Sequence, residues 1–169
     1  MSELRILIAG IGNIFLGDDA FGVEVIRRLS RIPLPAYVKV VDYGIRGLDL
    51  AYALMDGYDL TVLVDAVGQG GEPGTLYVIE PELGETSGAA PAMDAHSMDP
   101  VVVLGMVKAM GGQPKRVLVV GCEPESLGDE LEGKMGLSAT VAAALDGAVS
   151  LVKGLILKAV AEREVSAVA

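Results

Sequence analysis

Two adjacent carboxylates, Asp18 and Asp19, open a predicted helix directly after the glycine-rich turn of GIGNIFLGDDAFG, residues 10–22. A third acid, Asp65, ends an apolar run, and the only histidine, His96, follows later in the chain. One imidazole nitrogen and two carboxylates, with coordination positions left open, suit a zinc or a nickel ion. Two close carboxylates repel each other, so they favour a bound cation or a shared proton. These residue types therefore predict a cation-seeking site, provided that the fold brings them together.

Each of these residues also has a purely structural interpretation. A helix N-terminus favours negative charge, so both adjacent acids can be capping residues. We predict this role for Asp18, the better-placed N-cap, whereas Asp19 projects toward the ligand. A single histidine in an irregular loop is most often a surface residue, unless the loop folds back over the site.

The glycine turn also resembles nucleotide-binding loops. Gly10 and Gly12 match the first two glycines of the dinucleotide fingerprint G-x-G-x-x-G, but Phe15 replaces the third. Asp42, at the end of the second predicted strand, could bind a ribose. In the phosphate-binding loop G-x-x-x-x-G-K-S/T, an acid would stand in place of the lysine and repel phosphate. A nucleotide- or dinucleotide-binding protein that uses the Gly10–Gly12 turn is the alternative interpretation.

The single cysteine, Cys122, excludes an internal disulfide and a zinc site made of cysteines alone. It could act as a nucleophile together with His96. Its position at the end of an apolar run favours a small buried side chain without a catalytic role.

Apolar runs and helical spacings alternate along the chain and predict an α/β fold with a mostly parallel sheet. Asp99 followed by Pro100 is a typical helix start, and a long final helix begins at Ser138 with one packed apolar face. The predicted strands are 4–10, 36–44, 59–68, 74–80 and 114–124, and the predicted helices before Pro100 are 19–30 and 47–57. Because ligands bind beyond the carboxyl ends of such strands, we expect the acids after the first strand and Asp65, at the end of the third, to lie at the ligand edge.

The composition predicts one soluble domain over residues 1–169. The formal net charge of -10 argues against a nucleic-acid partner, because binding a phosphate backbone relies on Lys and Arg. No uncharged apolar run approaches the ~18 residues of a membrane span, and the first residues lack the features of a signal peptide. We therefore expect no membrane partner and a cytoplasmic location.

Five sequence blocks, in this order, resemble the hydrogenase maturation proteases over roughly residues 4–160. The blocks are ILIAGIGNIFLGDDAFGVEVIRRL, VVDYGIRGLDL, LVDAV, DAHSMDPVVVLGMV and VGCEPESL with the later GLSATVAAAL. The resemblance implies a three-layer α/β/α sandwich of the phosphorylase/hydrolase-like type, with a five-stranded, mostly parallel sheet and one antiparallel strand. It also implies a cytoplasmic, aspartic-type endopeptidase, active as a monomer.

The family removes a C-terminal extension from the large-subunit precursor of a nickel–iron hydrogenase after nickel insertion. By resemblance, the partner is this hydrogenase large-subunit precursor, and the metal is the nickel held in it, with zinc or cadmium as substitutes. Asp19, Asp65 and His96 match the family's catalytic and metal-binding trio. A nickel-binding accessory protein without peptidase activity is a further alternative.

Two departures from the family pattern bear on specificity. After the second strand the family commonly has D-G-G-T-x-G, whereas this chain has DYGIRG at residues 42–47, which adds Arg46 near the expected cleft. Asp19 stands where many members have glutamate, which keeps the charge on a shorter side chain. The precursor that is cleaved is therefore expected to differ from those of better-known members.

Overall fold

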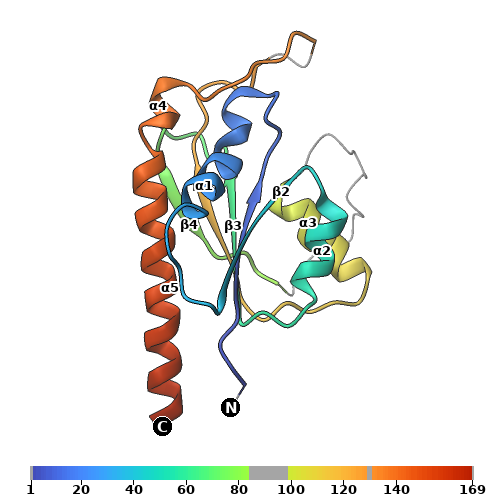
Figure 1. The fold of residues 1–169 in the computed structure, drawn as a ribbon. Coiled ribbons are helices and arrows are strands. Elements are labelled where there is room, and N and C mark those ends of the chain that lie inside the picture. Colours follow the sequence, from blue (N-terminus) through green and yellow to red (C-terminus); the bar gives the residue numbers. More distant parts are fainter. Residues whose placement is uncertain (1, 84–98, 129–130, 169) are drawn as a thin grey trace.

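The computed structural model describes residues 2–83, 99–128 and 131–168, which form one five-stranded sheet with helices on both faces (Figure 1). The strands are β1 (Ile6–Ile11), β2 (Val38–Gly44), β3 (Leu60–Ala66), β4 (Leu76–Ile79) and β5 (Val117–Cys122). Their order across the sheet is β2-β1-β3-β5-β4, and of these five β4 alone runs antiparallel to its neighbour. The predicted α/β fold with one antiparallel strand is confirmed.

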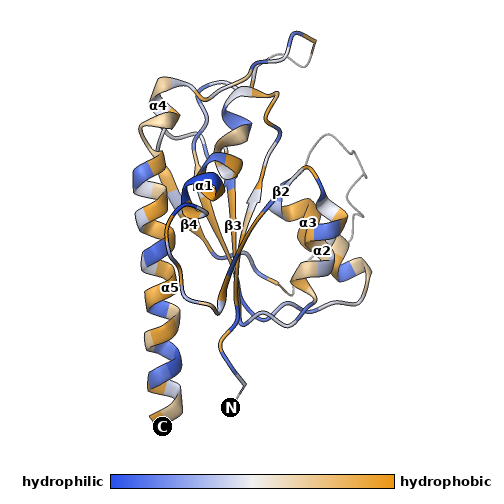
Figure 2. Cartoon of the chain, in the orientation of Figure 1, coloured by the Kyte–Doolittle hydropathy of each residue, from blue (hydrophilic) through white to orange (hydrophobic). Residues whose placement is uncertain are grey.

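Helices cover both faces of the sheet, which gives three layers. The helices are the 3-10 helix η1 (Gly17–Ala20), α1 (Phe21–Leu29), α2 (Gly47–Leu54), α3 (Pro100–Ala109), α4 (Ala139–Ala142) and α5 (Leu145–Val168). One core lies between the sheet and α1, α4 and α5, and the other between the sheet and α2 and α3. Because both faces are covered, β1 and β3 are apolar along most of their length (Figure 2).

The C-terminal helical stretch Ala139–Val168 is long and apolar enough to cross a membrane by length and composition alone. Its composition has another explanation in this fold, because one face of the stretch packs into the core. Five apolar side chains on that face are buried: Val141, Leu145, Ala148, Val152 and Ile156. The predicted packed face of the last helix is therefore confirmed.

The two central strands, β1 and β3, end where the chain changes direction across the sheet. From β1 the chain continues to β2 on one side, and it then returns to β3 on the other side. Ligands in open α/β sheets bind at such switch points, beyond the carboxyl ends of the strands. Asp19 lies in η1, which follows β1, and Asp65 is the penultimate residue of β3. The fold thus places both acids at the switch point.

Helix α1 approaches the sheet very closely at Gly22. A Cβ added there would lie 2.1 Å from the backbone oxygen of Val64 and 2.4 Å from that of Ile11. In the dinucleotide fingerprint, the third glycine permits this kind of approach. Here Gly22 permits it, whereas Phe15 at the fingerprint position is exposed.

We expect Gly22→Ala to lower the free energy of unfolding by about 3 kcal/mol, because the added methyl group pushes α1 away from β1 and β3. The measurement is urea unfolding at pH 7. Gly154→Ala is the matched control, since a Cβ at Gly154 meets nothing within 4 Å on α5. That variant should gain up to ~1 kcal/mol from helix propensity. Equal effects of the two substitutions would contradict the close-packing argument.

Candidate active site

Asp65 is a buried carboxylate without a hydrogen-bond partner for one oxygen. The residue is 2 % exposed, and among the described residues no group hydrogen-bonds to its Oδ1. Burial raises the pKa of Asp65 well above its usual range, and the negative charges of Asp19 and Asp99 raise it further. Buried polar atoms are normally paired, so an orphaned carboxylate oxygen needs an explanation. A ligand that arrives from outside the described residues is one.

Asp19 is half-buried and lies near enough to Asp65 for its negative charge to raise the pKa of Asp65. Its Oδ2 accepts a hydrogen bond from the backbone N–H of Asn13 at 2.9 Å. Burial raises the pKa of Asp19, and this hydrogen bond offsets only part of the rise. The structure therefore brings two predicted site residues together as a pair of carboxylates that are hard to ionise at the same time. Such a pair favours a cation.

The glycine turn supports Asp19 rather than a phosphate. Gly12 has a φ of +151°, and a Cβ added to it would lie 1.9 Å from the backbone oxygen of Asp19. The N–H of Asn13, which a phosphate would need, is bound by the Asp19 carboxylate. Asp42, the residue suggested for a ribose, accepts from the N–H of Gly44 in its own turn. This geometry disfavours the nucleotide-binding interpretation.

Asp18 is not a helix cap, and the prediction of that role was wrong. Neither η1 nor α1 has a side-chain cap, and Asp18 is fully buried. Its carboxylate accepts hydrogen bonds from the N–H groups of Glu125, Ser126 and Ser138 at 2.7–3.0 Å, and from the Ser138 hydroxyl at 2.9 Å. Burial alone would raise the pKa of Asp18, but these hydrogen bonds outweigh it and lower the pKa. Asp18 joins three distant backbone positions.

Asp99 is the acid near the site that sequence reasoning missed. It caps α3 as predicted, because its Oδ1 accepts from the N–H of Val102 at 2.9 Å and Pro100 follows it. Its charge also raises the pKa of Asp65, although 34 positions separate the two residues in the sequence. In the sequence, only the helix start at Asp99 and Pro100 could have indicated that this acid lies near the ligand edge.

The remaining candidates have different outcomes. His96 lies outside the described residues, so its predicted place beside the two acids stays a prediction. Within the described part of the chain, no three His, Cys, Asp or Glu side chains form a metal cluster.

Cys122 is fully buried, and burial, with the charges of Asp18 and Glu123, raises its pKa to about 11. A protonated, inaccessible thiol is a poor nucleophile, which agrees with the structural interpretation.

The segment 42–47, which departs from the family pattern, forms a compact turn. Arg46 donates to the backbone oxygen of Asp42 at 2.6 Å and lies 3.4 Å from a carboxylate oxygen of Asp49. Its guanidinium also lies 5.6 Å from the centre of the Tyr43 ring. Arg46 is thus held against its own turn at the carboxyl end of β2.

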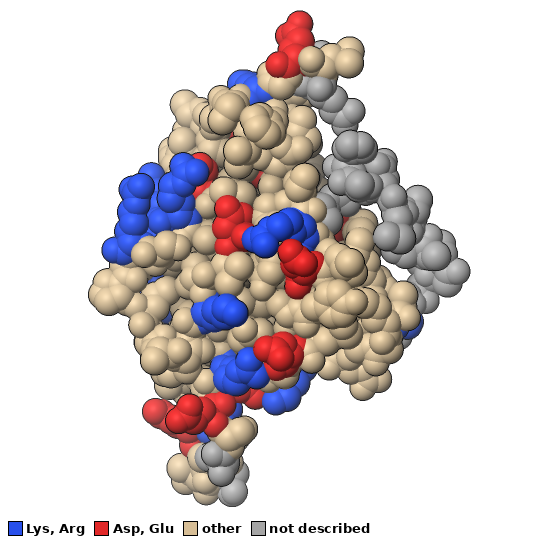
Figure 3. Space-filling view, turned by 45° about the vertical axis from the view of Figure 1, so that its right-hand side comes forward, with Lys and Arg blue, Asp and Glu red and all other residues tan. Residues whose placement is uncertain are grey.

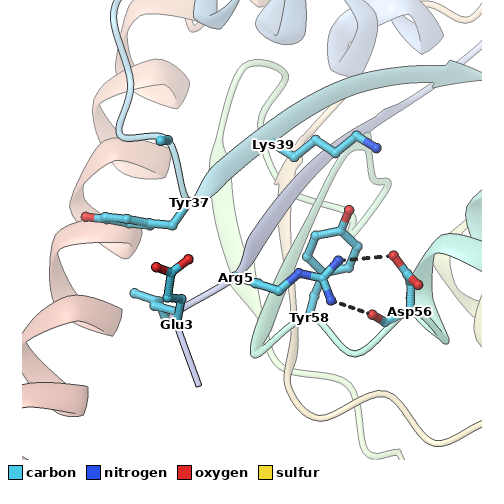
Figure 4. A pocket seen from close by; sticks show the side chains of 8 residues that line it. Glu3, Arg5, Tyr37, Lys39, Asp56 and Tyr58 are labelled. Atoms are coloured by element: carbon cyan, nitrogen blue, oxygen red, sulfur yellow. Dashed lines mark hydrogen bonds and ion pairs between the residues drawn. The ribbon is translucent and has the colours of Figure 1, made fainter. Parts of the chain in front are cut away.

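A cavity of about 690 Å³ lies at the opposite end of the sheet, where the strands begin (Figure 4). It is lined by Arg5, Tyr37, Asp56 and Tyr58, among others. Arg5 donates to the backbone oxygen of Asp56 at 2.7 Å and to its carboxylate at 3.1 Å, and it lies 4.6 Å above the Tyr58 ring. The arginine is therefore satisfied by its neighbours, and the two site acids lie at the other edge.

Known proteins resemble this chain over nearly its whole length. A family model described as hydrogenase maturation protease matches residues 23–154. A putative hydrogenase maturation protease of Methanocaldococcus jannaschii is 35% identical over 166 residues, which cover 94% of this chain and 100% of that protein. The hydrogenase 2 maturation protease of Escherichia coli is 34% identical over 156 residues, which cover 88% of each chain.

Solved structures give the same result. The hydrogenase maturating endopeptidase HybD from Escherichia coli superposes with a TM-score of 0.72 at 31% identity, over 92% of this chain and 94% of that chain. The hydrogenase 2 maturation peptidase from a Thaumarchaeota archaeon gives a TM-score of 0.68 at 35% identity, over 90% and 97%. Fold and sequence together define a peptidase. The chain belongs to the hydrogenase maturation protease family, and it is an endopeptidase of that kind.

Proposed function

We propose that this endopeptidase removes the C-terminal extension of a nickel–iron hydrogenase large-subunit precursor after nickel has been inserted. Asp19, Asp65 and His96 recognise the nickel, which is part of the substrate. Membership of the maturation protease family supports the reaction class. Recognition of the nickel is supported by the geometry of Asp19 and Asp65.

The orphaned Oδ1 of Asp65 is the observation that carries this proposal. Within the described part of the chain, this one oxygen of the buried carboxylate has no hydrogen-bond partner. An unpaired buried oxygen destabilises the free protein, so its presence is explained by a function that needs it. A cation carried by the precursor would supply the missing partner. It would also stabilise the charged form of both Asp65 and Asp19, whose pKa values burial has raised.

Recognition of this kind links cleavage to complete metal insertion. A precursor without nickel offers no ligand to the acid pair, so the scissile peptide is not held beside it. A correctly loaded precursor gains ligand bonds and positions the peptide for attack by water. Cytoplasmic action as a monomer stays a prediction.

The test is cleavage of a purified large-subunit precursor, supplied either nickel-loaded or nickel-free. We expect only the loaded precursor to be cut, and we expect Asp19→Asn and His96→Ala to slow its cleavage by at least about 100-fold. Glu164→Gln, an exposed acid on α5, is the control and should cut normally. Equal cleavage of both precursor forms by the unaltered enzyme would rule out recognition through the metal.

A further inference from the structure

We propose that an exposed apolar surface beside Asp19 docks an apolar segment of the precursor protein, away from the scissile peptide. We call this surface the apolar crest, and it consists of Ile14, Phe15, Leu127 and Met135. This inference rests on the proposed function, because it names a second contact between the same enzyme and the same substrate.

The crest side chains are exposed although they are large and apolar. The exposed fractions are 38% for Ile14, 56% for Phe15, 47% for Leu127 and 68% for Met135. The four residues lie on two backbone segments that pair at Leu16 and Lys134, and exposed apolar residues that lie next to one another mark interaction surfaces. Aromatic residues and methionine are also enriched in protein interfaces. In Figure 3 the upper part of the molecule, below its charged tip, is covered mainly by uncharged residues.

A hydrogen-bonded framework carries these side chains. The turn after β1 and the segment after β5 join at an isolated bridge between Leu16 and Lys134. The N–H of Lys134 donates to the backbone oxygen of Phe15 at 2.7 Å, and the N–H of Gly17 donates to that of Lys134 at 2.8 Å. The two segments lie together at the upper end of the molecule in Figure 1, toward which β1 runs. The crest is thus a built surface on two paired segments.

Asp18 holds both ends of the segment that follows β5. Its carboxylate accepts from the N–H groups of Glu125 and Ser126 at one end and from Ser138 at the other. The next residue in the chain is Asp19, whose carboxylate is bound by Asn13, the residue directly before Ile14. The position of the crest is therefore fixed relative to the candidate catalytic acids, as a docking surface for a macromolecular substrate requires.

The position of the crest next to the candidate catalytic acids indicates which molecule covers it. The crest adjoins the acids of an enzyme that cleaves proteins, so a bound precursor covers the surface next to them. The four crest side chains are apolar and exposed, so an apolar segment of the precursor fits them better than a charged one. A second copy of this chain is the competing occupant, and the experiment separates the two.

The experiment compares the double variant Phe15→Ser/Met135→Ser with the unaltered enzyme on nickel-loaded precursor. We expect KM to rise about tenfold while kcat and the unfolding midpoint in urea stay unchanged, because only binding area is removed. Leu157→Ser/Val165→Ser is the matched control, since both residues are 71% exposed on α5. This control should leave KM unchanged.

The possible results separate the two proposals. If the unaltered enzyme does not cut the loaded precursor, the proposed function fails. If it does cut, and the crest variant has the KM of the unaltered enzyme, the crest is not a substrate surface. A dimer of the unaltered enzyme that becomes a monomer in the crest variant, with KM unchanged, would assign the crest to self-association and overturn the inference.

Discussion

Asp18→Asn is expected to destabilise the protein by about 3 kcal/mol at pH 7, although the substitution only replaces one carboxylate oxygen by an NH₂ group. The buried carboxylate accepts four hydrogen bonds, from three backbone N–H groups and one hydroxyl. Asparagine offers one oxygen and turns an NH₂ group toward donors. At least one buried N–H then loses its partner, and hydrogen bonds to a charge are among the stronger ones. The measurement is the free energy of unfolding in urea.

The pH dependence identifies the charge as the cause. The pKa of Asp18 is lowered in the folded protein from its ordinary value of 3.8. A lowered folded pKa means stability that is fully present above pH 3.8 and is lost as the pH falls through the folded value. The difference between the unaltered protein and Asp18→Asn should therefore shrink in acid.

Asp42→Asn is the matched control for this prediction. Asp42 accepts one backbone N–H in its own turn, from Gly44, and asparagine can accept the same bond. Its cost should stay below ~0.5 kcal/mol. If Asp18→Asn were as mild as this control, the four hydrogen bonds would not stabilise the fold as argued.

The central strands and the ligand edge could be predicted from local sequence. Continuous apolar runs bounded by glycine or acids predicted β1 and β3 within two residues at each end, because strands covered on both faces need apolar residues at every position. The same runs placed Asp19 after the first strand and Asp65 at the end of the third. The general rule for open sheets predicted only that these acids lie at the carboxyl edge. That β1 and β3 are neighbours, and that the charge of Asp19 acts on Asp65, was found in the structure.

The role of Asp18 could not be predicted in this way. Its partners lie 107 to 120 positions further along the chain, and local spacing shows only a helix start. Gly22 and Asp99 are similar cases. Gly22 is needed because α1 approaches the backbone of Val64 in β3. Asp99, which caps α3, matters because its charge raises the pKa of Asp65 in β3. What sequence reasoning missed are contacts that only the folded sheet creates.

Asp65→Asn is expected to stop cleavage and yet make the free protein more stable at pH 7, by about 1–2 kcal/mol. Burial and the charges of Asp19 and Asp99 raise the pKa of Asp65 far above 3.8, so the charged form is unfavourable in the folded protein. A raised folded pKa means stability that is fully present below pH 3.8 and is lost as the pH rises through the folded value. The amide cannot ionise, so the variant avoids this loss at neutral pH, and the gain should vanish in acid. Urea unfolding at pH 7 and at pH 3.5 measures the gain in stability and its loss in acid. A variant that is less stable than the unaltered protein at pH 7 would show that Asp65 has a stabilising partner beyond the described residues.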